Sequence, residues 1–427
     1  MTRRRILVPF GTRPEVIKLA PVVHALRAAG HEVITIDTGQ HQDAAMSGDV
    51  QRDLGLVPDV RLPKPDGLGG LVTAALATIA THPADLVLAL GDTHTVPAYA
   101  LAARNAGLPF AHLEAGLRSF NPRSAEEVNR RVAAATAQLH FAPTTRAAAF
   151  LHDEGVPAER VFVVGNPVID TLRAKGVTPV PPSERSGVLV TAHRASNVDD
   201  PARLARLVDV VGRLAAIGPV RFPVHPRTRA RLQEHGLAAR LAALPGVTCE
   251  EPLPYDDLLA ALANARVVVT DSGGLQEEAA YLGVPVVVLR RSTPRWEGVE
   301  AGTAVLTGIT SDDEADRAVA AAHRLSTPSE LARVAALPCP YGDGRTGARV
   351  AALLADPALN RLLALDEPDH TDGTLPWTTT PGPEVLPPVR PAPSRPGRTT
   401  FSLPAQAAPS FPLRAAPSFP LRLPYEC

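Results

Sequence analysis

Three acidic residues stand beside segments whose pattern could bring them together for proton transfer. Asp92 and Glu114 each follow an apolar run, and Glu126 precedes a helical pattern. Because the carboxyl ends of parallel strands share one edge of a sheet, the three carboxylates are expected on one rim. Crowding there can raise one pKa while a neighbour stays ionised, which suits moving a proton at carbon or at a sugar oxygen. The simpler alternatives are a helix N-cap for Asp92 and a helix-dipole partner for Glu126.

Two glycine-containing turns predict two anion-binding helix N-termini, one near the start of the chain and one in its second half. Gly11–Glu15 and Asp271–Gly274 each follow an apolar run and open a helical pattern, so unpaired backbone N–H groups are expected there. In the first turn Arg13 adds a guanidinium that can bind a diphosphate, and Lys18 lies one helical turn further on. An ordinary helix start with a solvated arginine explains Arg13 equally well.

The second turn carries residues suited to a nucleotide sugar. Ser272, Gly273 and Gly274 would let backbone approach a phosphate, and Glu278 could accept ribose hydroxyls from one turn into the helix. Arg295 follows a later apolar strand and adds positive charge. His193 ends another predicted strand and is expected to enter the same cleft, although a lone histidine is more often a buried imidazole.

The elements that must position these residues form two sets of strands alternating with helices, which predicts parallel pairing. The fold class is therefore α/β, with two Rossmann-like doubly wound domains over residues 1–170 and 171–356 and a ligand cleft between them. The stretch Val168–Ser186 is read as the linker. The predicted strands are Ile6–Phe10, Val33–Asp37, Asp85–Leu90, Phe110–Leu113, Leu139–Ala142, Val161–Gly165, Gly187–Thr191, Val220–His225, Val247–Cys249, Val267–Thr270 and Val284–Leu289.

Residues 357–427 are predicted to be a largely disordered, proline-rich tail. After about Asp366 the composition changes, since 15 of the 44 prolines fall in the last 62 residues. An octapeptide also occurs twice, at Ala407–Arg414 and Ala415–Arg422. Such a segment cannot offset its ordering entropy with a core.

Composition excludes several classes of function. A chain of 427 residues with 45% apolar residues can bury a large core, and a formal charge of -1 provides no basic field for nucleic acid. The three cysteines lie far apart, so neither a disulfide framework nor a zinc site is expected, and a cytoplasmic location fits. No signal segment or membrane span is expected, because the apolar runs are short.

Taken together, the motifs resemble the non-hydrolysing UDP-N-acetylglucosamine 2-epimerases over about residues 5–355. The resemblance implies the glycosyltransferase-B type of fold, with the last helix returning to the first domain. It is carried by Gly11–Glu15, Thr38–His41, Gly91–Thr93, His112–Ser119, Glu126–Arg130, His193–Arg194, Asp271–Glu278 and Glu297–Thr303. Among the departures, Leu258 stands where the family has an aromatic residue that packs on the uracil.

The resemblance also implies roles for single residues. The catalytic set would be Asp92, Glu114, Glu126 and His193. The UDP-binding set would be Arg13, Lys18, Ser272, Gly273, Gly274, Glu278 and Arg295. No metal or redox cofactor is expected.

The implied activity is an isomerase reaction that interconverts UDP-N-acetylglucosamine and UDP-N-acetylmannosamine, in which UDP is eliminated and added back. A cytoplasmic homodimer that serves cell-surface polysaccharide synthesis is the expected setting. Two alternatives stay open: a glycosyltransferase of the same fold, and a nucleotide-sugar sensor with little or no activity.

Overall fold

The computed structural model describes residues 2–40, 50–365, 367 and 371. The prediction of a disordered tail therefore falls almost wholly outside the described residues, as does His41 of the Thr38–His41 motif. Residues 2–365 belong to one compact unit. No helix in the described ranges is long and apolar enough to cross a membrane.

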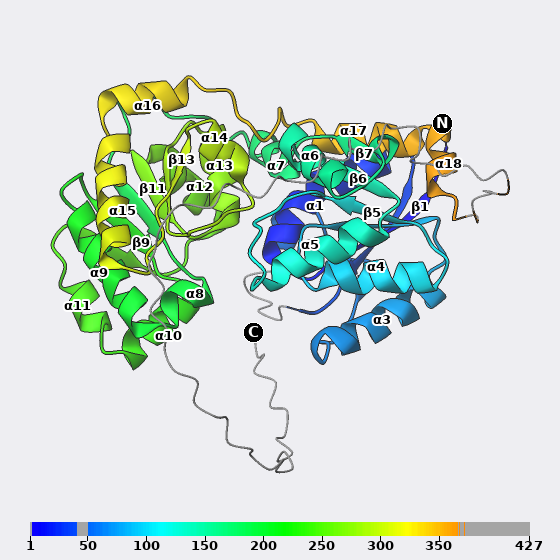
Figure 1. Cartoon of the computed structure of the whole chain (residues 1–427), viewed down its shortest axis with the longest axis horizontal. Helices are drawn as coiled ribbons and strands as arrows, with labels where there is room; N and C mark the ends of the chain where they lie inside the picture. The colour runs from blue at the N-terminus through cyan, green and yellow to red at the C-terminus, as the bar shows by residue number, and fades with distance from the viewer. Residues whose placement is uncertain (1, 41–49, 366, 368–370, 372–427) are drawn as a thin grey trace, which may run out of the picture. The chain divides into compact units, whose positions relative to one another are not determined.

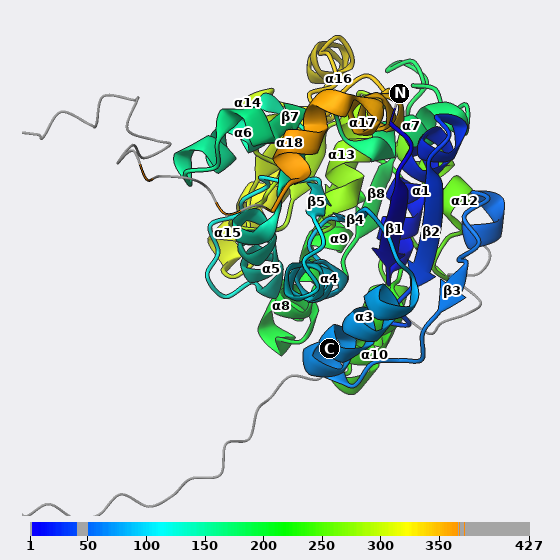
Figure 2. The ribbon, with the colours of Figure 1, turned by 90° about the vertical axis from the view of Figure 1, so that its right-hand side faces the viewer.

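A seven-stranded parallel sheet forms the first half, in the order β3-β2-β1-β4-β5-β6-β7. Figure 2 shows β1 between β2 and β4, where the strand order reverses direction. Its elements are β1 Arg5–Phe10, α1 Arg13–Ala28, β2 Glu32–Asp37, β3 Val60–Arg61, α3 Gly67–Thr81, β4 Leu86–Leu90, α4 Thr95–Asn105, β5 Phe110–Leu113, α5 Ala125–Thr136, β6 Leu139–Ala142, α6 Thr145–Asp153, the 3-10 turn η1 Ala158–Arg160, β7 Val161–Val163 and α7 Pro167–Ala174.

A six-stranded parallel sheet forms the second half, in the order β10-β9-β8-β11-β12-β13. Its elements are β8 Val188–Thr191, α8 Ala195–Val198, α9 Pro201–Leu214, β9 Val220–Pro223, α10 Pro226–Glu234, α11 Ala238–Ala242, β10 Val247–Glu250, α12 Tyr255–Asn264, β11 Val267–Thr270, α13 Gly273–Tyr281, β12 Val286–Val288, α14 Trp296–Glu300, β13 Ala304–Leu306, α15 Asp312–Leu325 and α16 Pro328–Ala335. Figure 1 shows α9 and α15 side by side against this sheet.

Both faces of the first sheet are buried, as the continuous apolar strands require. Ile6 and Val8 belong to the cluster on the α1 and α7 side, whereas Leu7 packs with Val96 and Tyr99 of α4. Because alternate residues of a strand face opposite sides, one strand supplies both cores. This confirms the predicted α/β class with two parallel, doubly wound sheets.

The last described helices are α17 Thr346–Ala355, η2 Pro357–Leu359 and α18 Asn360–Leu363. α17 packs on α1 of the first half. A Cβ on Gly347 would lie 2.7 Å from the carbonyl oxygen of Pro21, so a glycine is needed where the two helices approach. Leu362 and Leu363 are buried. The ordered chain thus continues past residue 356, where the sequence predicted the tail to begin.

The predicted linker Val168–Ser186 is wrong over its first part, which is α7. The side chain of Asn166 caps this helix by accepting from the Val168 N–H at 3.1 Å, and Pro167 takes its first position. The predicted domain limit at residue 170 consequently falls inside α7. Two short strands, β3 and β13, were also missed; β3 has only two residues, which are too few to show a pattern.

Candidate active site

A cavity of about 250 Å³ lies at the carboxyl ends of the central strands of both sheets. β1 and β4 flank the point where the first sheet reverses its order, and β8 and β11 do the same in the second. Ligands of doubly wound folds bind at such points. The lining residues are Thr12, Arg13, Pro14, Glu15, Ile17, Lys18, Leu90, Gly91, Asp92, Thr93, Glu114, Val168, Tyr255, Leu258, Ser272, Gly274, Leu275, Glu278 and Arg295.

The turn between β11 and α13 presents a helix N-terminus to this cavity. Ser272 is the N-cap residue, but its side chain accepts no hydrogen bond from the helix, and the first turn holds no acidic residue. A Cβ on Gly274 would meet no atom within 4 Å, and its backbone angle φ is not in the left-handed region. Packing therefore does not explain this glycine, whereas close approach of a ligand does.

The turn between β1 and α1 differs, because Glu15 in the first turn of the helix binds donors just before the helix and adds an acidic group beside its N-terminus. The carboxylate of Glu15 accepts hydrogen bonds from the Gly11 N–H at 3.0 Å and from the Thr12 hydroxyl at 2.8 Å. The anion site expected at this turn stays a prediction. Arg13 lines the cavity and forms no hydrogen bond or ion pair with any described residue.

The Glu15 side chain also links the carboxyl ends of β1 and β4. Its other carboxylate oxygen accepts from the Thr93 hydroxyl at 2.9 Å, beside Asp92 at the end of β4. Burial raises the pKa of Glu15 to about 7, although its hydrogen bonds to Gly11 and Thr12 act in the opposite direction. A buried carboxyl that titrates near neutrality thus lies in the lining of the cavity.

Glu114 is buried with a strained backbone and three polar partners. Its φ of 63° is in the left-handed region, which a non-glycine residue enters at a cost of about 1–3 kcal/mol. Its carboxylate accepts from Lys18 Nζ at 2.5 Å and from Asn166 Nδ2 at 2.6 Å. Burial would raise the pKa of Glu114, but the charges of Lys18 and Arg295 hold it below its usual range. Glu114 is therefore a buried carboxylate that neighbouring cations keep ionised.

Glu277 connects this cluster to the second half. Its carboxylate accepts from Lys18 Nζ at 2.8 Å, from Asn166 Nδ2 at 3.0 Å and from Arg295 Nε at 2.8 Å. Lys18 is thus paired with two carboxylates, which orients it toward Glu114 and leaves less of its charge for a nucleotide. Lys18 also lines the cavity, and its predicted role in UDP binding stays a prediction.

Asp92 lies at the end of β4 and is held by α5. Arg130 donates to its carboxylate, and Asn129 Nδ2 donates to its backbone oxygen at 2.8 Å. Burial would raise the pKa of Asp92, but Arg130 and further cations keep it lowered. Asp92 and Glu114 are therefore two ionised carboxylates in one cavity.

Glu126 and His193 lie outside the lining of this cavity and are more exposed. The Glu126 side chain is 42% exposed, accepts from the Ser124 hydroxyl, and lies 3.9 Å from Arg194 Nη1. His193 is 40% exposed, and its Nδ1 lies 3.2 Å from Asp271 Oδ1. Burial lowers the pKa of His193, although Asp271 opposes the shift. The structure thus brings Asp92 and Glu114 together directly, and places Glu126 and His193 on opposite halves around Arg194.

Glu278 is buried beside the α13 turn, with its carboxylate fixed by Tyr255. The Tyr255 hydroxyl donates to Glu278 Oε1 at 2.8 Å, and burial raises the pKa of Glu278. Leu258 lies about one helical turn after Tyr255 in α12 and also lines the cavity. Arg295 lies against the turn, since a Cβ on Gly273 would be 3.4 Å from its guanidinium carbon.

The sequence analysis missed Glu15, Asn166, Tyr255, Asp271 and Glu277 as functional residues. Asp271 is fully buried and accepts from the His193 and Arg194 N–H groups, so it shapes the end of β8. Glu15, Asp271 and Glu277 stood within the motifs considered, but their roles depend on partners far away in the chain. No cluster of three or more His, Cys, Asp or Glu suited to a metal occurs in the described residues.

The comparisons with known proteins agree with this fold. A family model described as UDP-N-acetylglucosamine 2-epimerase matches residues 24–355. A crystal structure of the UDP-GlcNAc 2-epimerase of Methanocaldococcus jannaschii, in complex with UDP-GlcNAc and UDP, superimposes with a TM-score of 0.73 at 32% identity. It covers 82% of this chain and 99% of the archaeal one. The protein thus has the fold of the glycosyltransferase-B type, with two Rossmann-like halves.

Two curated relatives narrow the class to a family. A protein of Ralstonia solanacearum named probable UDP-N-acetylglucosamine 2-epimerase is 37% identical over 81% of this chain and 97% of its own length. The UDP-2,3-diacetamido-2,3-dideoxy-D-glucuronate 2-epimerase of Pseudomonas aeruginosa is 34% identical over 82% of this chain and 99% of its own. The chain belongs to the UDP-N-acetylglucosamine 2-epimerase family, a family of isomerases.

Proposed function

We propose that this protein interconverts UDP-N-acetylglucosamine and UDP-N-acetylmannosamine by eliminating UDP and adding it back. One observation carries the proposal: two ionised carboxylates, Asp92 and Glu114, and the uncapped N-terminus of α13 line the same cavity. Proton transfer and diphosphate binding can therefore act on one substrate molecule.

In the proposed elimination, a carboxylate of the first half removes the proton from carbon 2 as the bond from carbon 1 to the UDP oxygen breaks. The electron pair of that bond leaves with UDP, and the carbon 2 electrons form the double bond of 2-acetamidoglucal. Departure of the diphosphate builds positive charge at carbon 1, which makes the proton removable. Re-addition of UDP with protonation of the opposite face of carbon 2 gives the epimer.

The N–H groups at the start of α13, together with Arg13 and Arg295, are proposed to stabilise the leaving diphosphate. Arg13 is favoured as the main cation because it has no partner among the described residues, whereas Arg295 shares its charge with Glu277. Ser272, Gly273 and Gly274 would approach the phosphates, and Glu278 would accept the ribose hydroxyls. Lys18 would act chiefly by orienting Glu114.

Asp92 and Glu114 are proposed as the central catalytic carboxylates, and Glu126 and His193 as further catalytic residues. Support for the second pair comes from Arg194, which follows His193 in the chain and lies 3.9 Å from Glu126. We also propose a homodimer, a cytoplasmic location and a role in cell-surface polysaccharide synthesis. Two domains meeting near residue 170 are proposed on the basis of the two separate sheets.

Incubation in heavy water tests the proposal. Purified protein should place deuterium on carbon 2 of UDP-N-acetylglucosamine and generate UDP-N-acetylmannosamine, with no acceptor present, as followed by NMR. Transfer of the sugar only when an acceptor is added would favour a glycosyltransferase. Binding of the nucleotide sugar with no exchange at carbon 2 would favour a sensor. The 2,3-diacetamido uronate nucleotide, tested in parallel, reports whether the substrate is the one named for the Pseudomonas aeruginosa relative.

A further inference from the structure

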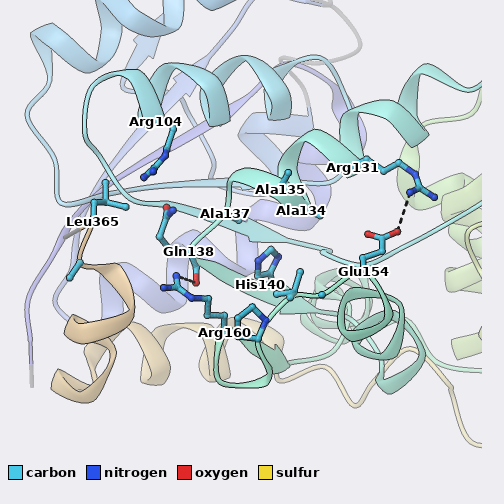
Figure 3. A pocket seen from close by; sticks show the side chains of 14 residues that line it. Arg104, Arg131, Ala134, Ala135, Ala137, Gln138, His140, Glu154, Arg160 and Leu365 are labelled. Carbon is cyan, nitrogen blue, oxygen red and sulfur yellow. Dashed lines mark hydrogen bonds and ion pairs between the residues drawn. The ribbon is translucent and has the colours of Figure 1, made fainter. Parts of the chain in front are cut away.

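A second cavity, of about 670 Å³, lies in the first half and shares no lining residue with the candidate active site. Figure 3 shows it between α4, α5, the start of β6 and the segment that joins α6 to η1. Ala364 and Leu365 also line it, and they lie beyond residues 24–355 that the family model matches.

Three arginines and one acidic residue give this cavity its charge. Arg131 lies 3.3 Å from Glu154, which also accepts two hydrogen bonds from the buried Arg118, and 3.7 Å from Glu127, so Arg131 belongs to a network that contains carboxylates. Arg104 and Arg160 form no ion pair with any carboxylate among residues 2–40 and 50–365. Two positive charges in one cavity therefore have no carboxylate partner among the described residues: Arg160 is half-buried, and Arg104 is exposed at the last turn of α4 and free to bind an anion.

Arg160 is held in place by the protein itself. Its Nη1 donates to the Gln138 carbonyl at 3.3 Å and to the Leu362 carbonyl at 3.2 Å. A guanidinium ordered in advance loses little further entropy on binding an anion, and its remaining N–H groups suit the oxygens of a phosphate. Figure 3 shows Arg104 extending from α4 toward Gln138, on the side of the cavity across from Arg160.

The rest of the lining leaves room beside the arginines. Ala134, Ala135 and Ala137 come from the end of α5 and the residues after it, and Val156 and Pro157 from the segment before η1. These short apolar side chains offer contact area to the uncharged part of a ligand and few competing hydrogen bonds.

We propose that this cavity is a binding site for a phosphorylated small molecule, with the phosphate between Arg104 and Arg160. The site is separate from the one that binds the substrate, and it does not depend on the epimerase reaction. Two arginine contacts to one phosphate are the expected recognition chemistry.

Calorimetric titration of the full chain with inorganic pyrophosphate tests the site. We expect two classes of binding, of which saturating UDP removes only one. Arg104→Gln should weaken the UDP-resistant class by about tenfold or more. Arg317→Gln, an exposed arginine on α15 of the second half, should leave both classes unchanged. Arg104 has no hydrogen bond to lose, so the variant is expected to melt like the wild type.

Crystals soaked in tungstate, an oxyanion with a strong anomalous signal, locate the binding directly. A peak between Arg104 and Arg160 would support the proposal. It would be overturned by a single class of pyrophosphate binding that UDP displaces fully, by unchanged UDP-resistant binding in Arg104→Gln, or by tungstate peaks that avoid the two arginines.

Discussion

The N-termini of α1 and α13 use the same structural feature in opposite ways. Both follow a central strand, both line one cavity and neither has a side-chain cap, but the first turn of α1 contains Glu15, which binds the Gly11 N–H and the Thr12 hydroxyl, whereas the first turn of α13 contains no acidic residue. Helix N-termini attract anions from any source, including a carboxylate in the first turn of the same helix. A glycine-containing turn therefore predicts an anion-binding site more strongly when the protein places no acidic side chain of its own beside the turn.

The two halves also contribute different groups to the cavity. In the first half, Asp92 and Glu114 are paired with Arg130 and Lys18, which keeps the carboxylates ionised and oriented. In the second half, the α13 turn contributes backbone donors to the cavity. We infer that the first half supplies preorganised acid–base groups and that the second half, together with Arg13 of the first, supplies most of the groups that bind the nucleotide.

The sharpest test of this division is Glu114→Gln. Loss of the carboxylate charge should reduce turnover by about 10³-fold or more, while UDP binding stays nearly unchanged, because Glu114 is not among the groups proposed to bind the nucleotide. Deuterium exchange at carbon 2 and calorimetric binding of UDP measure the two effects. Glu32→Gln, at the amino end of β2, is the matched control and should be fully active. A large loss of UDP affinity with normal turnover would contradict the division.

Glu15→Gln tests whether the first turn is filled by a carboxyl group that titrates in the folded protein. Burial raises the pKa of Glu15 from 4.5 to about 7. The stabilisation that goes with a raised pKa is complete below pH 4.5 and is lost as the pH rises through about 7. Relative to the variant, the wild type should lose about 3 kcal/mol of unfolding free energy over this range.

Urea unfolding at several pH values between about 4.5 and 8 measures this effect. The amide of the variant can still accept from Gly11 and Thr12 and donate to Thr93, so it should fold. Parallel pH profiles for wild type and variant would show that the Glu15 carboxyl does not titrate in this way.

Gly274→Ala tests the second turn. The new Cβ meets no protein atom within 4 Å, so the helix should be stabilised slightly, by about 0.5 kcal/mol. UDP affinity should nevertheless fall by about tenfold, because the methyl group enters the space through which a phosphate approaches. Gly69→Ala in α3, where a Cβ also meets nothing within 4 Å, should show the stabilisation alone. Unchanged UDP affinity in Gly274→Ala would place the diphosphate elsewhere.

Leu258→Phe is expected to have the smallest effect. An aromatic ring in the lining near the α13 turn should strengthen UDP binding by about 0.5–1.5 kcal/mol if the uracil packs on α12. Leu68→Phe, an exposed position in α3, serves as the control and should leave the affinity unchanged. Equal affinity in both variants would indicate that the base does not reach Leu258.

Most of the fold followed from local patterns. Buried parallel strands such as β1 and β11 are continuous apolar runs between helical patterns, and both were predicted within a residue of their observed bounds. β3 was too short to leave such a pattern. The start of α7 was missed because the prolines later in the linker outweighed the capping signal of Asn166 and Pro167.

The candidate site was predictable where a residue follows a strand, and less so where its role depends on a distant partner. Asp92 and Glu114 line the cavity because their strands end there. Lys18 is 259 positions before Glu277, and nothing in its neighbourhood indicates that pairing. Glu126 and His193 satisfy the same strand or helix pattern but lie outside the lining, because local pattern does not specify the distance between two sheets.

The sequence by itself determined which residues form strands and helices, and therefore that acidic side chains and glycine turns stand at the carboxyl ends of parallel strands. Only the tertiary structure decided which charges meet: Glu15 beside the start of α1, Lys18 between Glu114 and Glu277, and Arg104 and Arg160 in one cavity without an ion pair to a described carboxylate. Backbone preferences act over a few residues, whereas electrostatic pairing acts over a few ångströms between segments that the chain separates by hundreds of positions.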